Sequence, residues 1–386
     1  MHVLGSLVDI VTSTGVIVHD GRFSHRQLER ATSNFAEGAR LGEGAFGTVY
    51  KGMLQVDGKE TQVAIKKIMD TTSDQSRKDF VNEYRIMKRV NHTNVVNILG
   101  FCDEDDNLFL VYELIENGNL DDQLYPAESA MDFHRYSGTD PAAAPLLLDW
   151  HKRHSIIVGI ASGLTYLHDE CKERLLHRDI KPSNVMLDKM FNAKLCDFGL
   201  VKQFSHKETS RSTDNIRGTK IYIDPAYIDT GRACSQNDVY SFGILMLEIV
   251  CCQRPSLNAA GDRNNLVEKV RTCYYQKNAI LEAADKRLKG MSFDKQLERV
   301  LMIGLLCVQP DRHLRPRMRR VLDFLLNPTI SLSHLPPANH TLSTVIEGGS
   351  DATTSYDQYS MPSTVQPEHS QAAEDDGTTA FLTSQC

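Results

Sequence analysis

Long hydrophobic runs are missing from this sequence. No apolar stretch reaches the roughly 18 residues that a membrane-spanning helix needs, and the run at Leu301–Val308 is typical of a buried helix. Residues 1–18 contain Asp9, no basic leader and no small-residue cleavage site, which argues against a signal peptide. The initiator Met is followed by His2, whereas N-myristoylation requires glycine there. We therefore expect no transmembrane segment, no secretion signal and no myristoyl anchor.

Basic residues are missing from the C-terminal part of the chain. From Pro328 onward there are seven acids and neither Lys nor Arg, and the remaining 43 acids balance the 43 Lys and Arg of residues 1–327. A neutral body gives no reason to expect nucleic-acid binding. The acidic segment is also rich in Ser, Thr and Pro, so it cannot bury enough apolar surface to offset its conformational entropy. We predict that residues 328–386 form a disordered tail.

Cysteines occur without the spacing of a metal site. There are nine, an odd number, and Cys251 and Cys252 are adjacent, which is a poor geometry for bridging to each other. This usage predicts reduced thiols and a cytoplasmic setting. The content of 41% hydrophobic and 24% charged residues is ordinary for a globular protein with a sizeable core.

The periodicity changes along the first third of the chain. Residues 1–34 are interpreted as an N-terminal extension, in which Ser24 and Gln27 form a capping box for a short helix. Residues 35–113 are rich in strand-like runs, and two of these runs flank Asp57-Gly58, which is a hairpin-turn signal. This part is therefore predicted to form a sheet.

Helical periodicity governs most of the remainder. Asp79–Val90 alternates apolar and charged residues at helical spacing. From about 116 to 327 the chain is predicted to be mostly helical, with an amphipathic helix at Trp150–His168 and a buried one at Tyr240–Val250. Residues 125–147 contain prolines and an Ala-Ala-Ala-Pro stretch, which predict an inserted surface loop.

Four short motifs follow one another, each with residue types suited to phosphate or metal chemistry. They are Leu41-Gly42-Glu43-Gly44-Ala45-Phe46-Gly47-Thr48-Val49, Val63-Ala64-Ile65-Lys66, His177-Arg178-Asp179-Ile180-Lys181-Pro182-Ser183-Asn184 and Asp197-Phe198-Gly199. The glycine string alone is a weak signal, because dinucleotide-binding folds use it between a strand and a helix. Here the strand Thr48-Val49-Tyr50 follows, so the string is a hairpin tip whose N–H groups can approach phosphate oxygens. The order and spacing of the four motifs argue strongly against a chance match.

Lys66 lies on a predicted strand, where an inward-pointing ammonium is costly unless it is paired. Glu83, 17 residues later in the predicted helix, can supply the carboxylate. Taken alone, the motif fits a strand with an exposed lysine equally well.

Together these motifs resemble the protein kinase superfamily, and within it the plant receptor-like kinases, especially the lectin-receptor-like branch. The resemblance covers roughly residues 35–327 and extends to Leu110-Val111-Tyr112-Glu113, Leu148-Asp149-Trp150, residues 235–243 and Arg315-Pro316. It implies a two-lobed α+β fold. A small lobe at about 35–113 has a five-stranded antiparallel sheet and one regulatory helix, and a larger helical lobe follows at about 116–327, with ATP in the cleft.

The resemblance also implies a nucleotide site. Its residues are Leu41, Gly42, Gly44, Gly47, Val49, Ala64, Lys66, Tyr112, Glu113, Ile115 and Met186. In such a site the glycines cover the phosphates, and three apolar side chains from strands sandwich the adenine ring. Tyr112 is the gatekeeper, and the backbone of Glu113 and Ile115 reads the adenine edge.

The catalytic residues that the resemblance implies are Asp179, Lys181, Lys66 and Glu83. Asp179 accepts or orients the proton of the substrate hydroxyl, and Lys181 neutralises the γ-phosphate. Lys66 holds the α- and β-phosphates and pairs with Glu83. Lys181 together with Thr219 matches the pattern of Ser/Thr-specific kinases.

For the metal, the resemblance implies that Asn184 and Asp197 hold Mg²⁺, a hard cation that prefers oxygen ligands. It also implies that Asp238 braces the backbone near His177 and Arg178, which is a structural task.

The segment Leu200–Arg217 offers five hydroxyls, those of Ser205, Thr209, Ser210, Ser212 and Thr213. In similar kinases the residue matching Arg178 pairs with a phosphorylated loop, which would form a bidentate contact here. A loop that is merely rich in hydroxyls is the alternative. Cys196 maps near the nucleotide and is interpreted as a small core residue rather than a reactive thiol.

The sequence departs from the family pattern at Ile221–Tyr227. Related sequences read Gly-Tyr-Leu-Asp-Pro-Glu-Tyr, whereas this run reads Ile-Tyr-Ile-Asp-Pro-Ala-Tyr. Ala226 replaces a glutamate that normally pairs with the arginine corresponding to Arg315. We therefore expect Arg315 to lack its usual carboxylate and to be partly satisfied by water or another acid. We also expect Ala226→Glu to stabilise the helical lobe.

These observations predict an ATP- and Mg²⁺-dependent protein Ser/Thr kinase that acts on protein substrates, with a membrane receptor kinase as a further partner. No lectin-like ectodomain or membrane helix precedes the motifs, as in a receptor-like cytoplasmic kinase or a shortened receptor product. We expect a cytoplasmic protein, in solution or at the inner face of the plasma membrane. The alternatives are a pseudokinase adaptor and a small-molecule phosphotransferase.

Overall fold

The computed structural model describes residues 21–44, 47–69, 71, 73–104, 107–126, 148–212, 217–258, 264–288 and 292–332. All of them belong to the first of two units into which the chain divides, Met1–Thr341 and Leu342–Cys386. Residues 127–147 of the predicted loop and 333–386 of the predicted tail lie outside the described residues. Within the described part, no helix has both the length and the apolar character needed to cross a membrane.

An antiparallel sheet forms the first lobe, and its five strands confirm the predicted architecture. The strands are β1 (Arg40–Gly44), β2 (Gly47–Val56), β3 (Lys59–Lys67), β4 (Ile98–Glu104) and β5 (Asn107–Glu113), in the spatial order β1-β2-β3-β5-β4. Asp57 and Gly58 join β2 to β3 with φ values of 49° and 75°. Such left-handed values are needed in a two-residue hairpin turn, so the predicted turn is confirmed.

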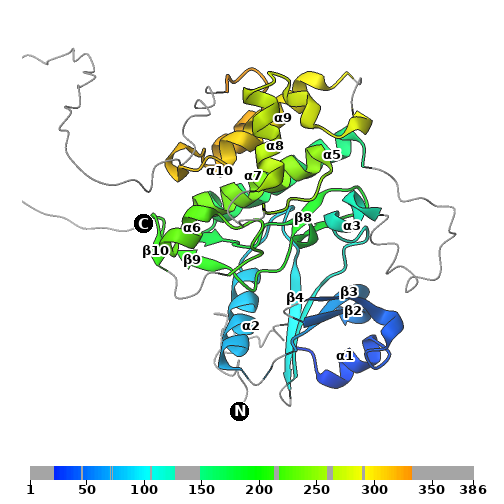
Figure 1. Cartoon of the computed structure of the whole chain (residues 1–386). Coiled ribbons are helices and arrows are strands. Elements are labelled where there is room, and N and C mark those ends of the chain that lie inside the picture. The colour runs from blue at the N-terminus through cyan, green and yellow to red at the C-terminus, as the bar shows by residue number, and fades with distance from the viewer. Residues whose placement is uncertain are drawn as a thin grey trace, which may run out of the picture. The chain divides into compact units, whose positions relative to one another are not determined.

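One face of this sheet is covered by the segment that precedes it. Helix α1 (His25–Ala31) begins with the predicted capping box at Ser24. Its Leu28 is fully buried in a cluster with Val63 and Ile65 of β3. The described part of the predicted N-terminal extension is therefore packed on the sheet, and Figure 1 shows α1 beside β2 and β3.

Helix α2 (Asp74–Met87) lies on the other side of β4 from α1 (Figure 1). It was predicted to begin at Asp79 but begins five residues earlier, where the Ser73 hydroxyl accepts hydrogen bonds from the first turn. The first turn of the helix is polar, so the apolar periodicity indicates a helix only from Phe80 onward. Glu83 is buried on this helix.

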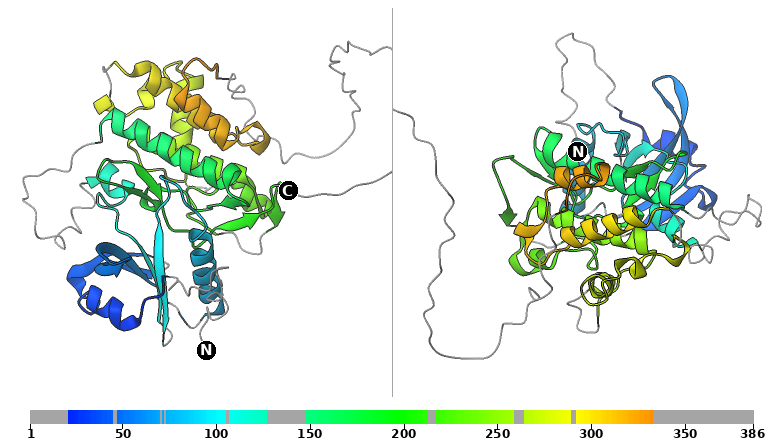
Figure 2. Two further views of the ribbon diagram at one scale, coloured as in Figure 1. Left: turned by 180° about the vertical axis from the view of Figure 1, so that it is seen from behind. Right: turned by 90° about the horizontal axis from the view of Figure 1, so that it is seen from above.

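The second lobe is mostly helical, as Figure 2 shows from two further directions. Its helices are α3 (Leu120–Leu124), α5 (Trp150–Thr165), α6 (Pro225–Thr230), α7 (Ser235–Cys251), α8 (Asn265–Tyr275), α9 (Asp294–Cys307) and α10 (Met318–Leu326). Paired short strands are β6 (Arg174–Leu176) with β9 (Lys202–Phe204), β7 (Val185–Leu187) with β8 (Ala193–Leu195), and β10 (Arg211–Ser212) with β11 (Arg232–Ala233). The helix predicted to reach His168 ends at Thr165 and is followed by a π-helical turn at Tyr166–Glu170.

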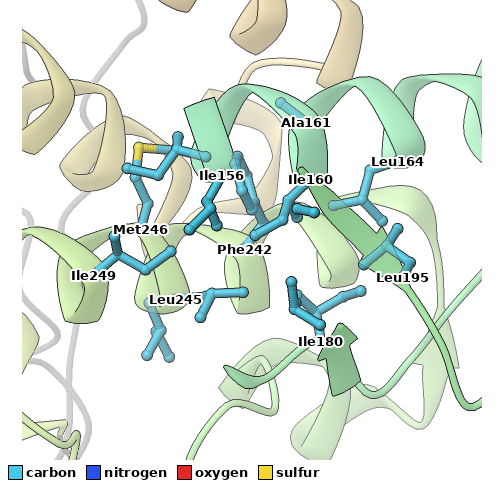
Figure 3. Close-up of a cluster of buried hydrophobic side chains, with 14 of the residues drawn as sticks. Ile156, Ile160, Ala161, Leu164, Ile180, Leu195, Phe242, Leu245, Met246 and Ile249 are labelled. Atoms are coloured by element: carbon cyan, nitrogen blue, oxygen red, sulfur yellow. The ribbon is translucent and has the colours of Figure 1, made fainter. Parts of the chain in front are cut away.

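The core of this lobe lies between α5 and α7 (Figure 3). The labelled side chains are Ile156, Ile160, Ala161 and Leu164 of α5, Phe242, Leu245, Met246 and Ile249 of α7, and Ile180 and Leu195 from the segments beside them. Nearly all of α7 is buried, as its apolar sequence predicted, although it begins at Ser235 and not at Tyr240. This buried helix supports the polar site described below.

The described part of the chain continues for five residues beyond the predicted start of the tail, and two of these residues are partly buried. Nη2 of Arg299 donates to the Ile330 carbonyl at 2.7 Å, and Ile330 and Leu332 are partly buried against the core. Part of the predicted tail, at Ile330 and Leu332, therefore packs on the lobe, and disorder of residues 328–386 stays a prediction. These two residues form a short apolar pair. The average composition of the whole tail does not indicate this pair.

Candidate functional site

The ammonium of Lys66 joins two buried carboxylates. Its Nζ lies 3.2 and 3.3 Å from the carboxylate oxygens of Glu83 and 2.8 Å from Oδ1 of Asp197. Burial alone would lower the pKa of Lys66, but the charges of Asp197 and Glu83 outweigh it and hold that pKa above its ordinary value. Burial would likewise raise the pKa of Asp197, but Lys66 keeps it below the ordinary value. The predicted Lys66–Glu83 pair is formed, and the alternative of an exposed lysine is wrong.

The register of the sheet places further predicted residues on the same face as Lys66. Val49 lies opposite Lys66 across β2 and β3, and Tyr112 lies opposite Ala64 across β3 and β5. Directly opposed residues, and residues two apart on a strand, point to the same side. Val49 and Ala64 are partly exposed, so this face carries apolar surface beside Lys66, and Leu41 on β1 and Met186 on β7 are partly exposed as well.

The tyrosine on this face contacts the Lys66 cluster directly. The Tyr112 hydroxyl donates to Oε1 of Glu83 at 2.6 Å. Burial, and then the charge of Glu83, raise the pKa of Tyr112 well above its usual range. The position was predicted, but the bond to Glu83 was not. Next along the chain, Glu113 accepts from Lys194 Nζ at 3.0 Å, and Ile115 is buried.

The three predicted glycines differ in their surroundings. A Cβ atom on Gly42 or Gly44 would meet nothing within 4 Å. On Gly47, with φ 149°, a Cβ would lie 2.1 Å from the Lys67 carbonyl oxygen, so the strand pairing itself requires glycine there. The backbone at Gly42 and Gly44 is exposed and open to a ligand.

A second polar cluster surrounds Asp179, which is 4% exposed. Its Oδ1 accepts from the backbone N–H of Thr219 at 3.0 Å and from the Thr219 hydroxyl at 2.9 Å. Its Oδ2 lies 2.8 Å from Lys181 Nζ and accepts from Asn184 Nδ2 at 2.8 Å. Lys181 also donates to the Thr219 hydroxyl at 2.8 Å. The carboxylate is therefore held by four donors in a fixed orientation.

Asp238 fixes the loop that carries Asp179. Its two carboxylate oxygens accept from the backbone N–H groups of His177 and Arg178 at 2.9 and 2.8 Å, as expected, and His168 adds a contact of 2.8 Å. Arg178 has φ 71°, an uncommon value for a residue with a side chain. Burial would raise the pKa of Asp238, but the hydrogen bond and charge of His168 lower it.

The two predicted metal ligands lie on adjacent stretches of backbone. The N–H of Cys196, the residue before Asp197, donates to the Asn184 carbonyl at 3.1 Å. Asn184 uses its amide Nδ2 toward Asp179, which leaves its Oδ1 as an oxygen donor beside Asp197. This donor set fits hard Mg²⁺. The described residues contain no group of three or more His, Cys, Asp or Glu that could hold a metal alone, so phosphate or water oxygens would have to complete the shell.

The similarity to known proteins covers the part of the chain that forms the two lobes. Residues 35–325 match the sequence profile of the family described as protein tyrosine and serine/threonine kinase. The chain is a member of the protein kinase family. Its fold, a five-stranded antiparallel sheet followed by a mostly helical lobe, is the kinase fold.

Plant receptor kinases are among the similar proteins. The L-type lectin-domain containing receptor kinase IX.1 of Arabidopsis thaliana is 40% identical over 320 residues, which cover 82% of this chain and 46% of that protein. Kinase VIII.1 of the same group is 39% identical over 311 residues, covering 79% of this chain and 40% of that protein. The probable kinase S.7 is 38% identical over 323 residues, covering 83% and 45%. This kinase chain thus spans less than half the length of these relatives.

Arg315 lacks its usual glutamate at position 226, but another acid takes that place and satisfies it more fully than expected. Nη1 and Nη2 of Arg315 donate to the two oxygens of Asp224 at 2.5 and 2.9 Å, and both side chains are fully buried. Asp224 stands two residues before Ala226. Its position directly before Pro225 is typical of a helix N-cap, which it is for α6, but that local signal does not reveal a partner 91 residues away.

Two more polar features of this kinase domain escaped the sequence reasoning. The carboxylate of Glu248, in the last turn of α7, accepts from the hydroxyls of Tyr125 and Tyr222 at 2.9 and 2.6 Å. Arg178 donates to the Leu200 carbonyl and the Tyr227 hydroxyl, while its buried Nε has no partner among the described residues. Glu248 lies inside an apolar stretch, where a single acid gives no indication of its partners.

Cys196 is partly buried, and burial together with the nearby charge of Asp197 raises its pKa above the ordinary range. A raised pKa disfavours the reactive thiolate. The interpretation of Cys196 as a packing residue is consistent with this environment.

Proposed function

We propose that this protein is a serine/threonine kinase that transfers the γ-phosphate of ATP to Ser or Thr hydroxyls of protein substrates. The observation that carries the proposal is one connected polar network built from separate motifs. Glu83, Lys66 and Asp197 form its first half, and Asp179, Asn184, Lys181 and Thr219 form the second. The backbone bond between Cys196 and Asn184 joins the two halves.

The first half suits phosphate binding. Phosphoryl transfer needs charge neutralisation and alignment more than covalent help from the protein. Lys66, whose charge is secured by two carboxylates, would contact the α- and β-phosphates of ATP. The partly exposed surface of Leu41, Val49, Ala64 and Met186 would receive the adenine ring, and the open backbone at Gly42 and Gly44 would face the phosphates.

Asn184 and Asp197 would hold Mg²⁺, which when bound supplies positive charge that neutralises phosphate oxygens. The pKa of Asp197 lies below its ordinary value, which keeps this carboxylate ionised for binding a cation. A hydrogen bond from Lys66 holds the carboxylate of Asp197 in place. A hydrogen bond from Asn184 does the same for Asp179.

The second half suits the acceptor hydroxyl. Asp179 would accept or orient the proton of a substrate Ser or Thr, with its carboxylate fixed by Thr219 and Asn184. Lys181 would balance charge on the transferred phosphate. The contact between Lys181 and Thr219 supports Ser/Thr rather than Tyr specificity, because this pair of residues matches the pattern of Ser/Thr-specific kinases.

An adaptor without turnover is the alternative. No predicted catalytic or metal-binding position is substituted in this chain, and the pairs that they form are assembled. Asp224 satisfies Arg315, so Ala226 no longer counts as evidence of a degraded kinase. Both observations favour an active enzyme.

Phosphorylation of the segment from Leu200 to Arg217 is proposed as the regulatory step. Arg178 offers a guanidinium whose Nε lacks a partner among the described residues, and guanidinium groups bind phosphate strongly. Of the five hydroxyls in the segment, Thr213 lies outside the described residues. The similar proteins are receptor kinases, so we include a membrane receptor kinase and a cytoplasmic or membrane-proximal location in the proposal.

The first test is transfer itself. Purified protein incubated with ATP and Mg²⁺ should phosphorylate its own Ser and Thr residues, and mass spectrometry should locate phosphate within residues 200–217. Asp179→Asn should lower the rate by a factor of about 10²–10⁴, because it removes the proton acceptor, and should leave ATP affinity nearly unchanged.

Lys66→Met is the contrasting variant, since it removes a group proposed to touch the nucleotide and should weaken both ATP binding and transfer. An Asp179→Asn protein that phosphorylates itself at the parent rate would refute the assignment. A parent protein that binds ATP without any transfer would favour the adaptor.

A further inference from the structure

Asp224 is placed to control the segment that would receive a protein substrate. This segment, Thr219–Tyr227, contacts the catalytic loop at both ends. Thr219 binds Asp179 and Lys181, and the Tyr227 hydroxyl accepts from Arg178 at 2.8 Å. Asp224 lies between these two ends of the segment.

The carboxylate of Asp224 is fully engaged. Besides the two bonds from Arg315, it accepts from Asn237 Nδ2 at 2.7 Å and from the backbone N–H of Ala226 at 3.0 Å. Four acceptor positions are about the capacity of a carboxylate. One side chain therefore links the docking segment to α7 through Asn237, caps α6 through Ala226 and binds the segment before α10 through Arg315.

Arg315 is equally complete. Nε donates to the Gln309 carbonyl at 2.6 Å, and the second hydrogens of Nη1 and Nη2 reach the carbonyls of Gln236 and Pro310 at 3.1 and 3.2 Å. With the two bonds to Asp224, all five N–H donors of the guanidinium are used. A carboxylate added at position 226 would find no free donor.

We propose that Asp224 is the positioning residue that holds the substrate-docking segment, and that it performs alone the anchoring for which a carboxylate at position 226 would otherwise serve. The proposal deepens the proposed kinase function and rests on it. It assigns to Asp224 an effect on protein-substrate binding rather than on ATP, because all its contacts lie in the helical lobe and none involves Lys66, Asp197 or the glycine segment.

Position 226 is close enough to Arg315 to allow a rescue test. The Ala226 N–H and Nη2 of Arg315 donate to the same oxygen of Asp224, at 3.0 and 2.9 Å. A glutamate side chain at 226 can therefore reach the guanidinium if Asp224 releases it. The variants are Asp224→Asn, Ala226→Glu, the double variant, and Asp229→Asn as a control that neutralises an exposed acid of the same helix.

The acceptor protein in the assay is the full chain carrying Asp179→Asn, which supplies the hydroxyls without transferring phosphate itself. Asp224→Asn should raise KM for this acceptor about tenfold or more, keep ATP affinity within about twofold, and increase hydrogen exchange across residues 219–227. Ala226→Glu and Asp229→Asn should stay within about twofold of the parent in every measurement. The double variant should recover most of the loss in KM and exchange protection.

Equal behaviour of Asp224→Asn and Asp229→Asn would overturn the proposal, as would a double variant no better than Asp224→Asn. If Asp224→Asn fails to fold, thermal melting of the double variant decides, since a folded double variant supports the anchor and an unfolded one contradicts it. If the parent transfers no phosphate, the kinase proposal fails. Hydrogen exchange and melting still test the anchor in that case, so the two failures are distinguishable.

Discussion

The charge of Glu248 depends on the fold. Its side chain has no exposed area, and burial, opposed by the hydrogen bonds from Tyr222 and Tyr125, raises its pKa from an ordinary 4.5 to about 7. Asp121 adds to the rise, and Arg254 opposes it. In the unfolded chain this carboxyl ionises near its ordinary pKa, whereas in the folded protein it keeps its proton to near neutrality.

A pH-dependent stability follows from this difference. Between pH 4.5 and 7 the folded state binds one more proton than the unfolded state, so the contribution of Glu248 is fully present below pH 4.5 and is lost as pH rises to about 7. Glu248→Gln removes the titration. From pH 5 to 8 the variant should therefore gain up to about 3 kcal/mol of unfolding free energy relative to the parent.

Urea unfolding of both proteins at four pH values measures this gain. Glu282→Gln, at an exposed pair with Lys277, is the control and should follow the parent curve. Parallel curves for Glu248→Gln and the parent would show that the carboxyl is ionised throughout.

At the scale of elements, the packing of α7 against α9 depends on the absence of a side chain. A Cβ on Gly243 would lie 2.7 Å from Cβ of Cys307 and 2.8 Å from Cγ1 of Val308, so the two helices could not keep their separation. Gly243→Ala should lower the free energy of unfolding by about 1–3 kcal/mol, although alanine is the better helix former. Denaturant unfolding checks this.

Gly38→Ala is the matched control, because a Cβ there would meet nothing within 4 Å. Its unfolding free energy should stay close to that of the parent. An unchanged or raised stability for Gly243→Ala would mean that the α7–α9 contact relaxes without cost.

At the scale of the whole molecule, the boundary of the folded part can be tested with two truncations. A chain ending at Leu332 should keep kcat within about twofold and nearly the parent Tm, because the removed residues carry the whole net charge of −7 and little apolar sequence. A chain ending at Asn327 also loses the Ile330 carbonyl bound by Arg299 and the buried parts of Ile330 and Leu332. It should be less stable by about 1–3 kcal/mol.

Thermal melting and transfer kinetics of the two truncations give the answer. Equal Tm values for both would mean that residues 328–332 contribute nothing to the lobe. Loss of activity in the chain ending at Leu332 would mean that the acidic segment is required for catalysis.

The sequence by itself determined the features that depend on near neighbours along the chain. The capping box at Ser24 and the Asp57-Gly58 turn act within a few residues, and the alternation in β3 places Lys66 on the face opposite Val63 and Ile65. The motifs carry a resemblance to the protein kinases, and this resemblance predicted the two lobes and the Lys66–Glu83 pair. Local patterns of this kind are set by backbone geometry and need no knowledge of distant segments.

Only the tertiary structure decided which polar groups meet across the fold. Arg315 and Asp224 are 91 residues apart, and Tyr125 and Glu248 are 123 apart. For Arg315 the sequence did not indicate the actual partner, Asp224, which stands two residues before Ala226 at the start of α6. A buried guanidinium must find acceptors, but which acceptor it reaches is settled by the packing of α6, α7 and the segment before α10.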